Sequence, residues 1–356
     1  MRKTILEVNI KNFNKNIEKI KKYVGNKKIM PVIKANAYGT YINKRLDVIN
    51  KFDIVAVATV DEAIEIRKIK YNKEIFVLNP PSISDIENII KYNIIIGLSD
   101  KVFLEALKNI NKKIKVHLEI ETGMNRTGIK LNDLDDFINL IKENKNIVVE
   151  GIYTHLSSAD YDKEYTIMQL EKFHSAVEII KRNFNTIKYI HSSASNGLLY
   201  YDDSSNLVRP GIIMYGYESC DNKKIKLYPT CKLKTQVIFI KDVDKLESIG
   251  YSRKYITKKC MKVATIPIGY ADGLRRELSN KGKVIVNGKI THIIGNVCMD
   301  SCMIDITDIN DVTIGTDVYI WDNELITLQD VANECKTINY EILSTISYRV
   351  FREFIE

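Results

Sequence analysis

The sequence has no long uninterrupted apolar run. Nowhere in its 356 residues is there a stretch that approaches the roughly 18 consecutive apolar residues of a membrane-spanning helix. The N-terminal stretch 1–16, MRKTILEVNIKNFNKN, has two basic residues at its start, but polar residues interrupt it before the apolar core of a signal peptide can form. We therefore expect a cytoplasmic protein without a membrane partner.

The sequence also lacks paired cysteines. It contains no C-x-x-C motif, and no histidine or further cysteine stands at zinc-site spacing from Cys298 and Cys302, the two closest cysteines. This pattern predicts reduced, partly buried thiols and no metal site. The six cysteines are Cys220, Cys231, Cys260, Cys298, Cys302 and Cys335.

The net charge of +8 is not gathered into a binding patch. Lysines such as Lys21, Lys22, Lys27 and Lys28 alternate with asparagine and isoleucine, whereas a general nucleic-acid surface would combine basic residues with aromatics in a stripe. We expect a solvated, lysine-rich surface that attracts small anions weakly and binds no nucleic acid.

The first two thirds of the chain alternates short apolar runs with amphipathic stretches, for example 61–68 and 131–143. The first of these opens with Thr59-Val60-Asp61-Glu62, which fits a helical capping box. A doubly wound sheet would give the same alternation, but the count of eight β units favours a (β/α)8 barrel. The expected strands are 30–34, 54–59, 75–79, 94–98, 115–120, 148–154, 188–191 and 207–209.

After about Asn222 the short apolar runs continue, but no amphipathic helical stretches lie between them. Asn287-Gly288 suits a tight hairpin turn between two of these runs, and a short helix is expected near 328–335. The sequence therefore predicts a barrel over 10–222 and a smaller, mostly β domain over 223–356, together with residues 1–9. The expected strands of this domain are 232–241, 261–268, 283–286, 291–294, 303–306 and 318–321.

Lys34 closes the first predicted barrel strand. Functional residues of such barrels cluster at the carboxyl ends of the strands, and a charged lysine buried there without a partner is costly. Burial depresses a lysine pKa and makes the amine nucleophilic towards aldehydes. The alternative, a lysine that extends from the barrel mouth into water, is open on this residue alone.

The segment around Lys34 resembles a motif of the alanine racemase family. The motif VIKANAYG at 32–39 resembles the family's cofactor-lysine motif, and the resemblance continues in the family's order to residue 349. The further segments are ETGMNRTG at 121–128, GIYTH at 151–155, VRPGI at 208–212, GY at 250–251, IGYADG at 268–273, CMD at 298–300 and ISYR at 346–349.

The resemblance implies a (β/α)8 barrel that binds pyridoxal phosphate, a β-rich second domain and a head-to-tail homodimer. Lys34 would hold the cofactor covalently and act on one face of the substrate. Tyr251, supplied by the partner subunit, would be the opposing base, hydrogen-bonded to His155 beside the cofactor. The residues beside the phosphate would be Tyr38, Ser195, Gly211, Ile212 and Tyr348. Of these, Ser195 and Gly211 follow the seventh and eighth predicted strands, where barrels commonly hold phosphate.

The remaining implied roles concern charge and substrate. Arg209 matches the arginine that donates a hydrogen bond to the cofactor's pyridine nitrogen. Because a guanidinium keeps its proton, that nitrogen would stay unprotonated and be a weaker electron sink, which suits racemisation better than transamination. Arg126 would contact the cofactor's phenolic oxygen and the substrate carboxylate. Tyr270 and Met299 would reach the substrate from the partner subunit.

Several positions depart from the family. A typical member has a carbamylated lysine where Glu119 stands, and we hypothesise that Glu119 supplies the same negative charge, pairing with Arg126 without modification. Asn296 stands where arginine is common, Thr40-Tyr41 where His-Gly is common, and Phe351 where proline is common. These changes leave open a serine racemase or one of broader specificity.

Two other functions known for this fold agree less well with the sequence. An amino-acid decarboxylase would prefer a carboxylate, not Arg209, beside the pyridine nitrogen. A non-catalytic pyridoxal-phosphate carrier would lack both the second domain and Tyr251. The sequence therefore predicts a pyridoxal-phosphate-dependent racemase acting on L- and D-alanine, which by resemblance would supply D-alanine for bacterial peptidoglycan.

Overall fold

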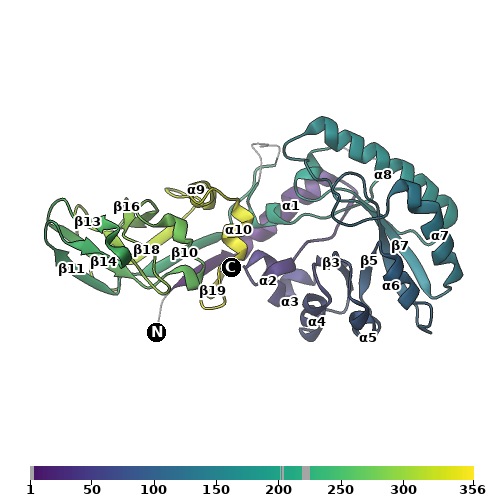
Figure 1. Cartoon of the computed structure of the whole chain (residues 1–356), viewed down its shortest axis with the longest axis horizontal. Helices are drawn as coiled ribbons and strands as arrows, with labels where there is room; N and C mark the ends of the chain where they lie inside the picture. Colours follow the sequence, from purple (N-terminus) through teal and green to yellow (C-terminus); the bar gives the residue numbers. More distant parts are fainter. Residues whose placement is uncertain (1–3, 201, 203, 219–224) are drawn as a thin grey trace.

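The computed structural model describes residues 4–200, 202, 204–218 and 225–356. Figure 1 shows two parts, a barrel on the right and a sheet domain on the left, with α10 (Asn339–Ser344) between them. Cys220 and the expected domain boundary at 222 lie outside the described residues. The five cysteines that are described carry free thiols. No helix in the described part of the chain is long and apolar enough to cross a membrane.

Eight parallel strands form the barrel, in chain order. Strands β3 to β8 form a six-stranded sheet, and β2 pairs with β9. A bridge between Val32 and Ala56 joins β2 to β3, and another between Ala194 and Arg209 joins β8 to β9. These contacts close the sheet and confirm the (β/α)8 prediction over a doubly wound sheet. The strands are β2 (Lys28–Ile29), β3 (Ile54–Val57), β4 (Glu74–Val77), β5 (Ile95–Leu98), β6 (Ile114–Glu119), β7 (Ile147–Tyr153), β8 (Tyr189–His191) and β9 (Leu207–Val208).

Helices cover the outside of the barrel (Figure 1). In α7, Leu134, Phe137, Ile138 and Ile141 are buried at the i, i+3, i+4, i+7 spacing of a helix with one apolar face. The predicted helix at 61–68 is also present as α4. The helices of this part are α1 (Ile10–Val24), α2 (Lys34–Tyr38), α3 (Leu46–Ile49), α4 (Val60–Lys68), α5 (Ile86–Lys91), α6 (Lys101–Ala106), α7 (Leu134–Glu143) and α8 (Lys163–Asn183).

The second part is a nine-stranded sheet in the order β11-β14-β17-β16-β15-β18-β10-β1-β19. The N-terminal strand β1 lies in this sheet, antiparallel to β10 and parallel to β19. The strands are β1 (Ile5–Asn9), β10 (Cys231–Gln236), β11 (Phe239–Val243), β14 (Met261–Ile266), β15 (Lys283–Val286), β16 (Lys289–Ile294), β17 (Cys302–Asp305), β18 (Asp317–Trp321) and β19 (Phe351–Ile355). A separate hairpin pairs β12 (Ser248–Ile249) with β13 (Tyr255–Ile256), and α9 spans Leu328–Glu334.

One strand prediction of this part was wrong. The run 232–241 is not a single strand but two, β10 and β11, because the backbone changes partners between them. Val237 N donates to Thr316 O, whereas Ile238 N donates to Thr265 O. The apolar pattern continues through the break, so it does not reveal where the chain leaves β18 and joins β14.

A buried aspartate fixes the connection between β8 and β9. The Asp202 side chain accepts hydrogen bonds from Ser192 Oγ and Ser205 Oγ, from Ser204 Oγ at 2.8 Å and from His174 Nε2 on α8 at 2.9 Å. Burial alone would raise the pKa of Asp202, but these hydrogen bonds outweigh it and hold the pKa at about 2. The loop that follows β8 is thereby tied to α8.

We predict that Asp202→Asn lowers the free energy of unfolding at pH 7 by about 2 kcal/mol. Because the folded pKa of Asp202 lies below its ordinary value near 3.8, this stabilisation is complete above about pH 4 and is lost as the pH falls towards 2. Urea unfolding of wild type and variant between pH 7 and 3 should give a stability difference that narrows at low pH. In exposed Asp308→Asn we expect little change at any pH, and a constant difference for Asp202→Asn would contradict the argument.

Candidate active site

The lysine predicted at the end of the first barrel strand begins a left-handed turn. In α2, Ala35, Asn36 and Ala37 have φ angles of 51°, 52° and 55°, and Tyr38 has 56°. A left-handed conformation costs a non-glycine residue roughly 1–2 kcal/mol, so the surrounding structure must hold this turn. Ala37 N donates to Ile33 O at 3.0 Å. The strand predicted at 30–34 was wrong in its bounds, because β2 ends at Ile29, before that range begins. Within the range only Val32 makes a bridge, to Ala56, and the turn begins at Lys34.

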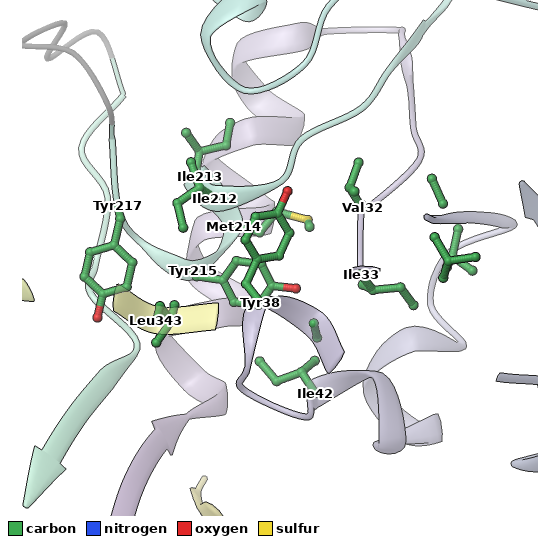
Figure 2. Close-up of a cluster of buried hydrophobic side chains, with 14 of the residues drawn as sticks. Val32, Ile33, Tyr38, Ile42, Ile212, Ile213, Met214, Tyr215, Tyr217 and Leu343 are labelled. Atoms are coloured by element: carbon green, nitrogen blue, oxygen red, sulfur yellow. The ribbon is translucent and has the colours of Figure 1, made fainter. Parts of the chain in front are cut away.

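Close packing at the end of the turn fixes its position. Gly39 has a φ of +78°, and a Cβ there would lie 2.4 Å from Leu343 O of α10. Figure 2 shows the Tyr38 ring among buried side chains of 212–215, with Leu343 nearby. The ring centroids of Tyr38 and Tyr215 are 5.1 Å apart. The turn therefore packs against both the last barrel connection and α10.

A cavity of about 250 Å³ lies at the carboxyl ends of the barrel strands. It brings together six of the residues predicted from the sequence: Lys34, Tyr38, His155, Ser195, Arg209 and Gly211. Ile212 is buried directly after Gly211 but does not line the cavity. Tyr340, which the sequence analysis missed, lines it from α10, with its ring 6.1 Å from that of Tyr38. No motif marked that short helix in the sequence.

A larger cavity, about 430 Å³, lies beside α9 in the sheet domain. None of the predicted site residues lines it, and its walls combine Leu278, Ile290, Leu325 and Val331 with a few charged side chains. The convergence of titratable groups marks the smaller barrel cavity as the candidate active site.

One end of the barrel cavity is shaped as an anion cradle. Gly211 N donates to Ser195 Oγ at 2.9 Å. A Cβ on Gly211 would lie 2.2 Å from Tyr38 Oη and 3.6 Å from Ser195 Oγ. The Tyr38 hydroxyl can therefore lie against residue 211 only because that residue is glycine. Backbone N–H and hydroxyl donors at this end of the cavity suit a phosphate group.

The guanidinium of Arg209 lies buried at another wall of the cavity. Its Nη1 donates to His191 Nδ1 and His191 O, both at 2.7 Å, and its Nη2 donates to Thr154 O at 2.7 Å and Ser192 O at 3.2 Å. These four bonds account for the four Nη hydrogens, and within the described residues nothing accepts from Nε. Burial lowers the pKa of Arg209 to about 10, so it remains charged at neutral pH. Its Nε–H is a donor left over for a ligand.

Two buried histidines lie behind Arg209, one in contact with its guanidinium and the other in contact with the first histidine. Because a guanidinium only donates hydrogen bonds, His191 Nδ1 must accept, which leaves the proton on Nε2. That nitrogen lies 2.8 Å from His117 Nδ1. Burial, assisted by the charge of Arg209, lowers the pKa of His117 to about 3 and that of His191 well below its ordinary range. Both rings are therefore neutral, and Arg209 sets their tautomers.

The groups around Lys34 favour its neutral amine. Burial lowers the pKa of Lys34, the positive charges of Arg126 and Arg209 add to this effect, and Glu62 opposes it. His155 across the cavity is also neutral, because burial and the charges of Arg209, Arg126 and Lys34 lower its pKa to about 3. Lys34 thus has the nucleophilic character that the sequence analysis inferred from its position.

Glu119 is buried at the end of β6, with 4% of its surface exposed. Thr127 Oγ1 donates to its Oε1 at 2.8 Å, but its Oε2 has no hydrogen-bond partner in the described part of the chain. The hydroxyl of Tyr153 donates to Leu78 O at 3.1 Å instead. Burial raises the pKa of Glu119, whereas the Thr127 hydrogen bond and the charges of Arg126 and Arg209 oppose the rise. The expected direct ion pair with Arg126 is absent from this single chain, in the part described.

Arg126 is exposed and does not line this cavity, although its charge acts on Lys34. Four more predicted site residues lie away from the cavity. Tyr251, Tyr270, Met299 and Tyr348 do not line it. They expose 71%, 44%, 53% and 85% of their surface, respectively. Tyr251 lies in the loop between β12 and β13. Figure 1 shows β13 at the end of the sheet domain that is farthest from the barrel. Within one chain, the structure does not bring these four residues to Lys34.

Family models match both parts of the chain. The model described as "Alanine racemase, N-terminal domain" matches residues 8–219, and the model described as "Alanine racemase, C-terminal domain" matches residues 230–354. The first match covers the barrel with its cavity, and the second covers the sheet domain that carries Tyr251.

Similar proteins are known over the full length. The chain is 38% identical to "Alanine racemase 2" of Caldanaerobacter subterraneus subsp. tengcongensis, with 100% of this chain and 95% of the relative covered. It is 36% identical to "Alanine racemase" of Clostridium kluyveri, with 98% and 93% covered. A crystal structure of alanine racemase from Bacillus anthracis with bound L-Ala-P aligns with a TM-score of 0.94 and 33% identity, covering 100% of this chain and 96% of that one. The cavity lies in the matched barrel and the identity extends through both domains, so this chain belongs to the alanine racemase family.

Proposed function

We propose that this protein interconverts L- and D-alanine with pyridoxal phosphate as cofactor, using Lys34 and Tyr251 as its two bases. The observation that carries the proposal is the barrel cavity, in which Lys34, the free donor of Arg209 and the anion cradle converge. An alanine racemase family member with these groups in one cavity has the groups that would hold the cofactor and one of the two bases that the reaction needs. Serine, or a broader range of amino acids, is the alternative substrate, because Asn296 and Thr40 differ from the family pattern.

The residues present fit the cofactor. Its phosphate would occupy the cradle of Tyr38, Ser195 and Gly211, next to Ile212, and its pyridine nitrogen would accept from Arg209 Nε, the donor that the protein leaves unused. Pyridoxal phosphate, when bound, supplies a conjugated ring that accommodates the electron pair left at the substrate's Cα when a proton is removed. Arg209 would stay charged and keep its proton, which leaves the ring nitrogen unprotonated.

Racemisation requires that a proton leaves one face of Cα and another arrives at the opposite face. The Lys34 amine would serve one face, because burial and the nearby arginines lower its pKa and so favour the neutral amine that can accept a proton. In our proposal the partner subunit's Tyr251 acts on the other face, next to His155, which is neutral and able to hydrogen-bond to a phenol.

The proposal includes a head-to-tail homodimer. Four residues with family roles at the site, Tyr251, Tyr270, Met299 and Tyr348, are exposed in the single chain. In a homodimer the sheet domain of each subunit would cover the barrel mouth of the other. Arg126 would then bind the substrate carboxylate, with Tyr270 and Met299 reaching in from the partner subunit. A cytoplasmic location and a role in supplying D-alanine for peptidoglycan also belong to this proposal.

The two-base, shared-site proposal can be tested by mixing two inactive variants. We expect Lys34→Ala and Tyr251→Phe each to lower the rate of D-alanine formation from L-alanine about 1000-fold or more. Unfolding and refolding the two together should restore activity, because each mixed dimer contains one site with both Lys34 and Tyr251. The measurement is D-enantiomer formation with added pyridoxal phosphate, with L-serine and L-lysine run in parallel to rank substrates.

Tyr161→Phe is the matched control, because Tyr161 is an exposed tyrosine of the barrel and its loss should leave the rate unchanged. No recovery in the mixture would show that both bases act within one chain and would refute the shared site. No racemisation of any of the three amino acids by wild type that carries its cofactor would refute the racemase itself.

The anion cradle predicts a steric effect at residue 211. Gly211→Ala should weaken pyridoxal-phosphate binding at least about tenfold, because its Cβ would displace the Tyr38 hydroxyl from the cradle. Equilibrium dialysis of the full-length protein would measure this affinity. Gly288→Ala, in a hairpin where a Cβ meets nothing within 4 Å, should bind the cofactor as wild type does. Unchanged affinity of Gly211→Ala would place the phosphate elsewhere.

Neutralising Glu119 should have opposite effects on substrate binding and on the stability of the fold. Glu119→Gln should raise the KM for alanine about tenfold, a loss of about 1.4 kcal/mol, because Arg126 loses a nearby negative charge. The same change should maintain or increase the free energy of unfolding, because it removes a buried charge with an unpartnered oxygen. Since the folded pKa of Glu119 is raised, this gain should grow as the pH rises above about 4.5.

Glu150→Gln is the matched control for this pair of effects. Glu150 is a buried carboxylate that pairs with Lys188 at 2.7 Å and with Lys115 at 3.3 Å. Its neutralisation should destabilise the protein and leave the KM unchanged. If Glu119→Gln instead leaves the KM unchanged, Glu119 does not act on the substrate through Arg126.

A further inference from the structure

The helix α4 begins with a capping box that is only half formed. Thr59 accepts a hydrogen bond from Glu62 N at 3.3 Å, as the motif predicts. In a complete box the Glu62 carboxylate would turn back to Thr59 N. Here Glu62 Oε2 accepts from Ala58 N at 2.7 Å, and Glu62 Oε1 accepts from Ala35 N at 2.6 Å. The carboxylate therefore links the end of β3 to the residue directly after Lys34.

This link acts where the left-handed turn begins. Ala35 is the first of four consecutive non-glycine residues with positive φ, and intrinsic preference opposes each of them. The far end of the turn is held by Gly39 N donating to Ala35 O at 2.8 Å and by Arg352 Nε donating to Gly39 O at 2.9 Å. At the near end, Glu62 binds the backbone N–H of Ala35 with a full negative charge, which makes this a strong type of hydrogen bond.

Glu62 also acts on Lys34 through its charge. The charged groups that influence the Lys34 amine are Arg126 from the loop after β6, Arg209 from the end of β9 and Glu62 from α4, and His155 faces it from the end of β7. The two arginines lower the pKa of Lys34, and Glu62 is the group that raises it. One carboxylate thus both binds the backbone directly after Lys34 and opposes the lowering of the Lys34 pKa by burial and the two arginines.

We propose that Glu62 is a positioning residue for Lys34, whose carboxylate holds the left-handed turn in place and balances the two arginine charges beside the amine. The inference rests on the proposed function, since it takes Lys34 as the lysine that binds the cofactor. Glu62 itself touches neither the amine nor the substrate, so its role is exerted through the Ala35 backbone and through its charge.

The test uses the full-length apoprotein and two readouts. The first is the pH dependence of Lys34 acylation by acetic anhydride, followed by peptide mass spectrometry. The second is the rate of pyridoxal-phosphate uptake, followed by absorbance at a pH high enough that the amine is neutral in every variant. The retained fold is checked by circular dichroism. The variants are Glu62→Gln and Glu62→Asp, with Glu65→Gln as the matched control, because Glu65 pairs with Lys68 on the exposed side of the same helix.

Glu62→Gln should lower the midpoint of Lys34 acylation by about 0.5 to 1 pH unit, since an opposite charge has been removed. It should also slow cofactor uptake at least about tenfold, since an amide cannot accept from both backbone N–H groups. Glu62→Asp keeps the negative charge, but its side chain is too short to reach both backbone N–H groups. Its midpoint of Lys34 acylation should therefore stay near that of wild type, while its cofactor uptake should be slower. Glu65→Gln should match wild type in both readouts.

An unchanged midpoint in Glu62→Gln would overturn the proposal, whatever its uptake rate, because loosened structure alone does not remove a charge effect. Should Glu62→Gln fail to fold, wild-type uptake by Glu62→Asp would overturn it instead. Failure of the proposed function would look different, since wild type would then not take up the cofactor on Lys34 at all, although the acylation shift in Glu62→Gln could still be measured.

Discussion

A buried guanidinium must find acceptors for its hydrogens, and the upper rim of this barrel is built around that requirement at Arg209. Its four Nη hydrogens go to His191, Thr154 and Ser192, which end or directly follow β7 and β8. Its own backbone bridges to Ala194 and closes the barrel between β8 and β9. These contacts fix the orientation of the side chain and use all of its Nη hydrogens, so that Nε–H is the donor that remains for a ligand. The constraint that closes the fold is therefore also the one that presents a charged donor to the cavity.

The electrostatics of the cavity follow from the same burial. Arg126 and Arg209 bring positive charge to the surroundings of Lys34, while the histidines there are kept neutral by burial and by that charge. Two carboxylates lie near this positive charge, Glu62 at the turn and Glu119 at the end of β6. The remaining positive field suits a ligand with a phosphate and a carboxylate, since both are anions.

The sequence predicted the features that depend on apolar periodicity and on strand order. Eight short runs predicted the closed barrel, and the positions of Ser195 and Gly211 after the last two strands predicted that they would meet. The left-handed turn at Ala35–Tyr38 could not be predicted, because no glycine marks it and distant contacts from Glu62, Arg352 and Leu343 impose it. Glu62 itself was visible only as half of a helix cap. Tyr340 was missed because its short helix α10 has no periodic pattern.

A tyrosine base must have its phenol near groups that can take or return its proton, and one chain does not provide this for Tyr251. Its side chain is exposed in the loop between β12 and β13, and Figure 1 shows β13 at the end of the sheet domain that is farthest from the barrel. The barrel cavity offers a neutral His155 and the charged Arg209 to a phenol that arrives there, and nearby positive charge favours a phenolate. In the proposed dimer each subunit therefore supplies the charged surroundings of a base that belongs to the other. The catalytic competence of Tyr251 is then a property of the assembly, because neither the sheet domain nor the barrel alone contains both the phenol and the charges that activate it.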